Sequence, residues 1–269
     1  MSRWPETPEE AWRMRFGTDP PQILPQIGDF LMHRSVREYS DRPVSEDLVT
    51  GLLGAAQSAA TSSNLQLYSI VSVQEPARRA EIARLCAGYE HVRKAPWFFA
   101  FIVDHHRLRH AARVVGEEAA GLSYLEFLIM AVVDAALAAE RLVCAAESLG
   151  LGICYIGALR DHAPEVKELL RMPDGTFGAF GLCLGWPEEP VTAHIKPRLN
   201  QSSIWYREYY DRDPEIAEYD ERLADFHRSE QMKGPPGWSK RSGRRVDRHH
   251  LTGREILKDW LAEQGMGTE

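Results

Sequence analysis

The sequence predicts a globular chain of mixed helices and strands, organised around one long buried helix. Residues 124–149 are the longest apolar stretch, and their few charges are scattered instead of forming one polar face. Apolar or alternating runs at 67–73, 97–103 and 177–185 have the length expected of strands. We therefore expect the long helix at the centre of the fold or of a dimer.

The composition is that of an ordinary globular protein. Its 269 residues allow one large domain or two small ones, and 44% of them are hydrophobic while 26% are charged. The net charge of −7, from 32 basic and 39 acidic residues, argues against general nucleic-acid binding, because phosphate contacts require a basic surface. The N-terminus lacks the apolar core of a signal peptide, and charges interrupt the stretch at 124–149. We expect a soluble, cytoplasmic protein with no membrane span.

Cysteine usage points to the same compartment. Cys86, Cys144, Cys154 and Cys183 show no CxxC spacing and lie within apolar runs. We expect reduced, small core residues in these positions, and neither disulfides nor metal ligands.

Residues 1–24 form an N-terminal extension. Thr7 can cap a short helix that has Pro8 in its first position and places Trp12 and Phe16 on one face. We expect an arm that docks elsewhere, with a second subunit as one option.

The next region alternates helical and polar segments. A short helix at 27–32 leads into a basic turn, and Ser45 is expected to cap a helix whose apolar residues recur with helical period. That helix ends in a run of small hydroxyl residues at 58–64. The run is either a solvated polar loop or a ligand loop that uses Thr61 and Ser63.

The middle of the chain supplies the predicted sheet. A helix at 76–85 follows the first strand, and the strand at 97–103 is apolar enough to be central. The clustered His105, His106 and His110 lack other residues at ligand spacing, so we expect no metal site. Further strands are expected at 153–158 and 177–185, with a short helix at 165–171 between them.

The C-terminal part, residues 201–269, has a different character. Tyrosines and alternating charges indicate wrapping segments, and a loop at 234–238 precedes a basic run at 240–248. That run is either a solvated face or a contact for a nucleotide phosphate. No GxGxxG, P-loop or GxSxG motif is present, which argues against Rossmann, P-loop and esterase sites.

A basic turn offers the clearest site signal. His33, Arg34, Ser35 and Arg37 place two guanidiniums, an imidazole and a hydroxyl within five residues. These cationic or basic groups repel one another, and the planar guanidinium of arginine binds phosphate and planar acceptor edges. One interpretation is therefore that an anionic ligand binds between them. A solvated basic turn is the alternative. A second basic cluster, Lys196-Pro-Arg198, and a glycine-containing strand between the two clusters favour the site.

The chain resembles the nitroreductase superfamily of flavoproteins, in particular the NADPH-dependent, oxygen-insensitive nitroreductases and flavin reductases. The resemblance spans about residues 27–265 and depends on the order and spacing of HRSVREYSDRPVSEDLV, AAESLGLGICYIGALR, FGLCLGWP, KPRL and YDERLADF. It implies an α+β fold with a mixed, mainly antiparallel sheet flanked by helices, a long buried central helix, and a homodimer with FMN at the interface. Residues 25–200 would then form the FMN-binding core, and residues 201–269 an excursion of the same domain.

The resemblance also implies which residues bind FMN. The predicted set comprises the basic turn, the hydroxyl loop, the strand end that lies along the isoalloxazine, and the second basic cluster: His33, Arg34, Ser35, Arg37, Thr61, Ser63, Tyr155, Ile156, Gly157, Ala158, Lys196 and Arg198. A cation near the pyrimidine edge would stabilise the reduced ring, and Gly157 would permit close approach of the backbone to N5.

The implied activity is ping-pong reduction of small acceptors. NADPH or NADH would deliver a hydride to FMN N5 and leave, and a nitroaromatic, quinone or free flavin would then be reduced in the same open site. The resemblance implies no catalytic acid or base from the protein.

Three departures from the family pattern concern the ligand contacts. Tyr89 stands where the family has a flavin-contacting Gln, and Asn64 replaces an aromatic residue of the substrate site. The arginines that contact the 2′-phosphate of NADPH do not align, so Arg228, Lys233 or the later basic run would substitute for them. Two alternatives stay open, namely a flavin enzyme specialised for one metabolite and a non-catalytic flavin-binding protein.

Overall fold

The computed structural model describes residues 5–22 and 25–269, so residues 1–4 and 23–24 of the predicted extension lie outside the described part. The chain forms two compact units. We call Met1–Arg34 with Ala193–Leu251 the helical unit, and Ser35–Thr192 with Thr252–Glu269 the sheet unit. The chain therefore passes from one unit to the other inside the predicted basic turn.

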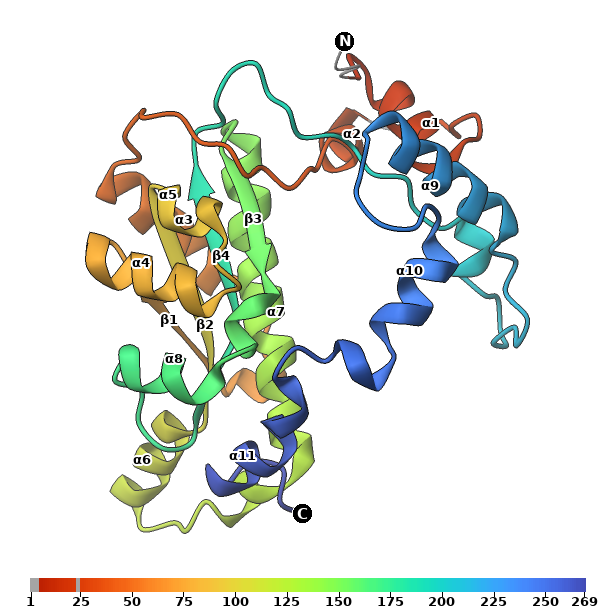
Figure 1. Cartoon of the computed structure of the whole chain (residues 1–269). Coiled ribbons are helices and arrows are strands. Elements are labelled where there is room, and N and C mark those ends of the chain that lie inside the picture. Colours follow the sequence, from red (N-terminus) through yellow and green to blue (C-terminus); the bar gives the residue numbers. More distant parts are fainter. Residues whose placement is uncertain (1–4, 23–24) are drawn as a thin grey trace. The chain divides into compact units, whose positions relative to one another are not determined.

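The sheet unit contains a four-stranded sheet in the order β1-β2-β4-β3. All three strand pairs are antiparallel, and a single parallel bridge joins Ser35 to Ile153 at the β3 edge. The strands and helices of this unit (Figure 1) are β1 (Tyr68–Ser72), β2 (Trp97–Asp104), β3 (Gly152–Ile156), β4 (Thr176–Gly185), α3 (Glu46–Gln57), α4 (Pro76–Leu85), α5 (Glu90–Lys94), α6 (His106–Val115), α7 (Leu125–Ser148), α8 (Ala163–Leu169) and α11 (Leu257–Glu263). The expected strands, the central position of the 97–103 strand and the long helix are confirmed.

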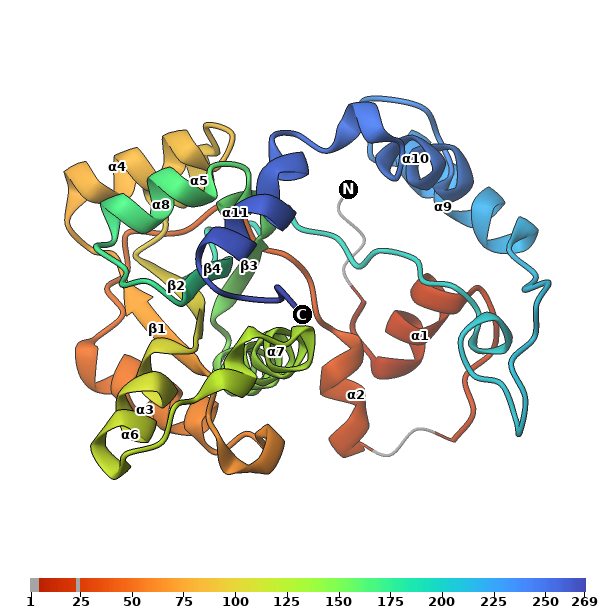
Figure 2. The ribbon, with the colours of Figure 1, turned by 90° about the horizontal axis from the view of Figure 1, so that it is seen from below.

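Helices cover both faces of this sheet (Figure 2). Side chains alternate along β2: Phe99 and Phe101 pack with α3 and α7, whereas Phe98 and Ile102 pack with α4, α5 and α8. A third cluster joins α11 to the sheet, with the Trp260 ring 5.9 Å from that of Phe177. The sheet is therefore buried on both faces, which explains why β2 is apolar from Trp97 to Val103.

Helix α7 packs on the sheet through small residues. Ala131, Ala135, Ala138 and Ala139 are fully buried and allow the helix axis to approach the strands closely. Its opposite side is also apolar, but it is exposed within this chain: Leu125, Ile129, Val132, Val133 and Leu137 are 39–51% exposed. One chain thus buries one face of the helix and leaves the other uncovered.

The two helix caps predicted from the sequence, at Thr7 and Ser45, are confirmed. Ser45 Oγ accepts from Leu48 N at 3.2 Å at the start of α3, and Thr7 Oγ1 accepts from Glu10 N at 3.2 Å at the start of α1. Both caps depend on neighbours within three residues, so sequence alone could locate them.

The helical unit contains α1 (Pro8–Phe16), α2 (Pro25–Leu31), α9 (Ala217–Ser229) and α10 (Trp238–Arg245). The first residues of the basic run at 240–248 lie in α10, for which the sequence predicted no helix. Asp220 of α9 supplies its cap, with Oδ1 accepting from Ser239 N at 2.7 Å, and the Tyr219 and Trp238 rings lie 5.9 Å apart. A cap provided from another helix leaves no local sequence signal.

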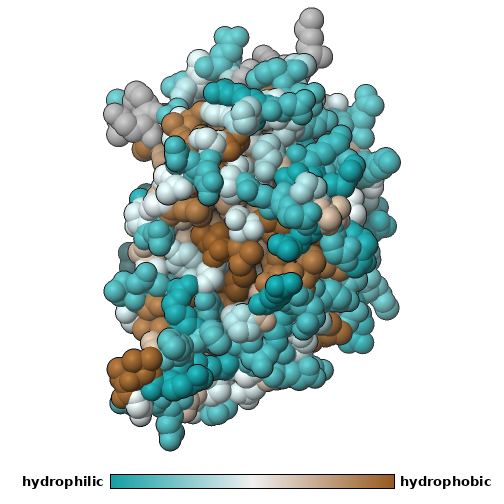
Figure 3. Space-filling view, turned by 90° about the vertical axis from the view of Figure 1, so that its left-hand side faces the viewer, coloured by the Kyte–Doolittle hydropathy of each residue, from teal (hydrophilic) through white to brown (hydrophobic). Residues whose placement is uncertain are grey.

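The surface agrees with the composition. On the face shown in Figure 3 most residues are hydrophilic, and apolar residues gather near the middle. In the described part of the chain, no helix is long and apolar enough to cross a membrane. All four cysteines are free; Cys86, Cys154 and Cys183 are buried as the sequence predicted, whereas Cys144 is only partly buried.

Candidate flavin site

The second half of the basic turn is fixed to the edge of the sheet. Val36 N donates to Ile153 O at 2.8 Å, and Ser35 forms the parallel bridge to the same residue. Val36 packs directly over Gly152, where an added Cβ would lie 2.7 Å from that of Val36. Gly152 is therefore required for this close approach, which places Ser35 and Arg37 along β3.

Arg37 lies near His91 of α5, whose ring stacks on that of Tyr89, the residue that precedes this helix. The Tyr89 and His91 rings stack at 5.1 Å, and burial together with the charge of Arg37 lowers the pKa of His91. His91 is consequently neutral near pH 7 and can accept or donate a hydrogen bond. No pattern in the sequence singles out His91, other than its position two residues after Tyr89.

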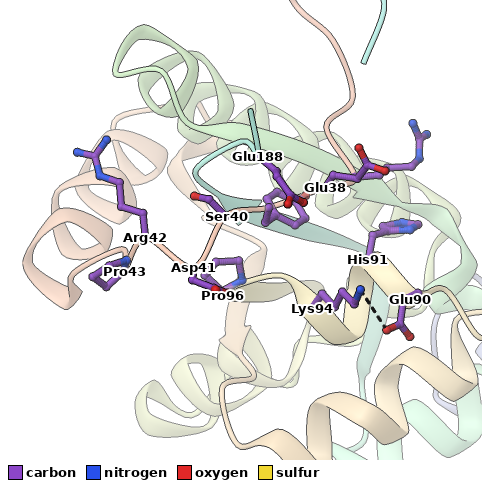
Figure 4. A pocket seen from close by; sticks show the side chains of 12 residues that line it. Glu38, Ser40, Asp41, Arg42, Pro43, Glu90, His91, Lys94, Pro96 and Glu188 are labelled. Carbon is purple, nitrogen blue, oxygen red and sulfur yellow. Dashed lines mark ion pairs between the residues drawn. The ribbon is translucent and has the colours of Figure 1, made fainter. Parts of the chain in front are cut away.

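A hollow of about 800 Å³ lies beside these groups (Figure 4). His91 and Lys94 of α5 line it together with Glu38, Glu188 and eight other residues, Arg37 among them. Lys94 is paired with Glu90 at 3.8 Å. Basic and acidic side chains are mixed in this lining, so its charge alone does not select an anion.

The hydroxyl loop is held by a buried carboxylate. Asp134 of α7 is fully buried, and its two oxygens accept from Ser62 N at 2.8 Å and Leu67 N at 3.1 Å. Between these anchors Ser63, Asn64 and Gln66 adopt positive φ values of 50–56°. Because this conformation is unfavourable for residues with a Cβ, the loop needs such an anchor. Thr61, Ser63 and Asn64 thus belong to one rigidly held loop.

The end of β3 presents backbone more than side chains. Ile156 and Ala158 are buried, so a ligand can reach this strand end at Tyr155, which is exposed, and at the backbone of Gly157, which is partly exposed. Gly157 has no positive φ, and an added Cβ would meet only Arg160 at 3.5 Å, an ordinary contact. The protein's own packing therefore does not require a glycine at this position.

Tyr155 is the one partly exposed side chain of this strand end. Its hydroxyl donates to Glu140 Oε2 of α7 at 3.1 Å, and its ring meets Phe180 edge-on at 5.7 Å. Burial, and then the Glu140 carboxylate, raise the pKa of the phenol well above its usual value. Tyr155 is therefore a neutral hydrogen-bond donor and not a base.

The first half of the basic turn and the second basic cluster lie together in the helical unit. Arg15 of α1 donates from Nη2 to His33 O at 2.7 Å and from Nη1 to Lys196 O at 3.4 Å. Arg198 N in turn donates to Arg15 O at 2.7 Å. One residue of the predicted extension thus joins the two clusters, which is a role that the sequence did not reveal.

Two of the three predicted substrate residues, Arg228 and Lys233, are exposed in the same unit, whereas Asn64 lies in the sheet unit. Arg228, at the end of α9, pairs with Asp225, and Lys233 lies in the following loop, where its carbonyl accepts from Arg241 at 2.6 Å. Burial, and then the charges of Arg241 and Lys196, lower the pKa of the adjacent His227. Arg241 and Lys196 therefore both lie close enough to His227 to act on its imidazole.

His105, His106 and His110 form the histidine cluster at which the sequence led us to expect no metal site. Residues 5–22 and 25–269 contain no group of three or more His, Cys, Asp or Glu residues that could hold a metal ion. His105 instead packs in the fold, with Nε2 3.2 Å from Phe127 O, and its burial lowers its pKa.

Of the predicted cofactor residues, His33, Arg34, Lys196 and Arg198 belong to the helical unit and the others to the sheet unit.

Two models of protein families match this chain. The model of the nitroreductase family matches residues 31–186, and that of the C-terminal domain of the nitroreductase family matches residues 196–269. An FMN reductase (NADPH) from Bacillus subtilis is 35% identical over 208 residues, which cover 75% of this chain and 83% of that protein.

Solved structures agree with the sequence comparisons. The NfrA1 nitroreductase from B. subtilis has a TM-score of 0.82 at 31% identity, over 90% of this chain and 99% of that one. The NADPH:FMN oxidoreductase from Vibrio harveyi, solved with NAD+, has a TM-score of 0.77 at 27% identity, over 90% and 99% of the two chains. The predicted α+β fold is confirmed, and the names of these relatives agree with the predicted cofactors. The chain belongs to the nitroreductase family.

Proposed function

We propose that this protein is an FMN-dependent NAD(P)H oxidoreductase that reduces nitroaromatics, quinones or flavins. The observation that carries the proposal is the cationic cluster of the helical unit, in which Arg15 joins the turn of His33 and Arg34 to the segment of Lys196 and Arg198. Relatives about one-third identical over most of this chain are named as NADPH-dependent FMN reductases and oxidoreductases.

The residues present fit FMN. Clustered guanidinium and ammonium groups suit a phosphate, which prefers charge-assisted and bidentate donors. In the sheet unit, Arg37 supplies a cation, the loop of Thr61 and Ser63 supplies hydroxyls, and the backbone at 155–158 supplies peptide groups for a planar ring. Bound FMN would supply the redox chemistry, as an acceptor of hydride from NAD(P)H and a donor to the second substrate.

The protein's own contribution is binding and orientation. Tyr155 keeps its proton because its pKa is raised, so it can hold a position through Glu140 but does not remove a proton from a substrate. We assign no catalytic acid or base. Asn64, Arg228 and Lys233 are proposed to contact the nicotinamide nucleotide or the second substrate, and Tyr89 the flavin.

We further propose that the protein is a homodimer. The exposed apolar side of α7, from Leu125 to Leu137, is an unusual surface for a monomer, and a second copy would bury it. Residues 25–200 would form the flavin-binding core, with 1–24 as an extension and 201–269 as a C-terminal excursion. The buried free cysteines fit a reducing compartment, and we propose the cytoplasm.

An anaerobic titration tests the reductase proposal directly. The purified protein, reconstituted with FMN, is titrated with NADPH and separately with NADH while the absorbance of oxidised flavin is followed. We expect stoichiometric bleaching, and the nucleotide that bleaches at lower concentration is the preferred donor. Bound flavin that neither nucleotide bleaches would contradict the reductase and leave a flavin-binding protein.

A further inference from the structure

Arg15 is an unusual residue for a terminal extension. It occupies the last turn of α1, yet it is only 5% exposed, whereas Arg13 on the same helix is exposed and pairs with Asp19 at 3.2 Å. Burying a guanidinium is costly unless its donors are satisfied. The contacts that satisfy Arg15 therefore indicate what it does.

The partners of Arg15 are backbone carbonyls from two distant parts of the chain. Nε donates to Leu31 O at 2.9 Å and Nη2 to His33 O at 2.7 Å, while Nη1 reaches Lys196 O at 3.4 Å. The Arg15 carbonyl accepts from Arg198 N at 2.7 Å. A single residue thus contacts the backbone just before and at the start of the first basic cluster, and at both ends of the second.

This geometry depends on the shape of a guanidinium. Its planar fork offers donors in fixed directions, so three carbonyls are held in one arrangement relative to one another. The α9 residue Arg222 adds a second restraint, since its Nη2 donates to Arg198 O at 3.0 Å. These backbone contacts hold the segment that carries Arg34 and the segment that carries Lys196 and Arg198 together, although their side chains have charges of the same sign.

We propose that Arg15 is a positioning residue for the anionic end of the flavin cofactor. It holds the turn of His33 and Arg34 against the Lys196–Arg198 segment, so that their side chains converge on a phosphate. The proposal rests on the proposed function, and it gives the N-terminal extension a role in the cofactor site. Arg15 itself does not contact the cofactor in this account, and its charge adds to the positive potential of the cluster.

Comparing FMN with riboflavin isolates this role, because riboflavin has the same ring system and no phosphate. Dissociation constants for both are measured by fluorescence quenching with the wild-type protein, Arg15→Met, Arg15→Lys and the matched control Arg13→Met. We expect Arg15→Met to weaken FMN binding at least about tenfold, equivalent to about 1.4 kcal/mol, with riboflavin binding changed little. Arg15→Lys, which keeps the charge without the fork, is expected to lose part of the FMN preference, and Arg13→Met none.

Other outcomes would overturn the proposal in distinguishable ways. Equal losses of FMN and riboflavin binding in Arg15→Met would mean that Arg15 acts through the fold and not through the phosphate site. If Arg15→Met prefers FMN over riboflavin as strongly as the wild-type protein does, the proposed role of Arg15 is wrong, and the proposed function is not affected. A wild-type protein that binds neither compound would overturn the proposed function as well. If Arg15→Met fails to fold by circular dichroism, an unchanged FMN-to-riboflavin ratio in Arg15→Lys overturns the proposal.

Discussion

Two buried charges of opposite sign hold two segments of the candidate site, one in each unit. Asp134 of the sheet unit accepts from the amides of Ser62 and Leu67, and Arg15 of the helical unit donates to the carbonyls of Leu31, His33 and Lys196. In both cases a charged side chain satisfies backbone groups that lie outside regular hydrogen-bonding patterns. The sign of the charge follows from the group to be satisfied, an anion for N–H and a cation for C=O.

The two environments differ in what surrounds the charge. Asp134 is fully buried in a helix that packs on the main core, and the loop that it anchors contains three residues with positive φ. Arg15 belongs to a short helix of a unit with fewer buried apolar residues. Loss of Asp134 should therefore act mainly on stability, and changes near Arg15 mainly on ligand binding.

The largest effect is expected for Asp134→Ala. The substitution leaves the buried amide of Leu67 and the partly buried amide of Ser62 without their acceptor, so we expect the free energy of unfolding to fall by about 3 kcal/mol. Urea unfolding followed by circular dichroism measures the loss. Asp134→Asn keeps one acceptor oxygen and should lose less, and Glu126→Ala at the exposed start of α7 is the control. A loss no larger than that of Glu126→Ala would remove Asp134 from its anchoring role.

A smaller effect, on binding instead of stability, is expected for Arg198→Ala. Its side chain is exposed, so unfolding should change little, whereas loss of a charge-assisted bond of about 2 kcal/mol should weaken FMN binding about thirtyfold. Fluorescence titration measures the affinity, with the exposed Arg212→Ala of the same unit as control. Equal FMN affinity in both variants would contradict the assignment of the basic cluster.

The strand end provides an intermediate case in the sheet unit. Because a Cβ at Gly157 would make only an ordinary contact within the protein, Gly157→Ala should leave the free energy of unfolding within about 1 kcal/mol of wild type. If the flavin lies against this backbone, FMN affinity should nevertheless fall about tenfold. Gly51→Ala is the control for a general effect of added methyl groups, because a Cβ at Gly51 would have no neighbouring atom within 4 Å. Unchanged FMN affinity would mean that the ring does not approach Gly157 closely.

The smallest effect is expected for Tyr155→Phe. The change removes one hydrogen bond to Glu140 at a partly exposed site, so the free energy of unfolding should fall by less than about 1 kcal/mol. Denaturant midpoints of the two proteins give the difference. A loss as large as that of Asp134→Ala would show that the Tyr155–Glu140 hydrogen bond stabilises the structure as much as the contacts of buried Asp134 do.

Local patterns in the sequence predicted much of the fold. The caps at Thr7 and Ser45, the strand at 97–103 and the long apolar helix each depend on residues close together in the chain. The order and spacing of the motifs identified the family, and the residues of the candidate site follow from that resemblance. These features need no knowledge of distant contacts, because capping and periodicity act within a few residues.

The sequence by itself determined the four strands, the long helix α7, the family and the chemical types available for an anionic cofactor. Only the tertiary structure decided that Asp134 anchors a loop 72 positions earlier and that Arg15 reaches a carbonyl 181 positions later. It also decided that Asp220 of α9 caps α10. The physical reason is common to all three: the partners are backbone atoms, which every residue carries. Such contacts leave no pattern in the side chains, and only the folded path of the chain brings them within reach.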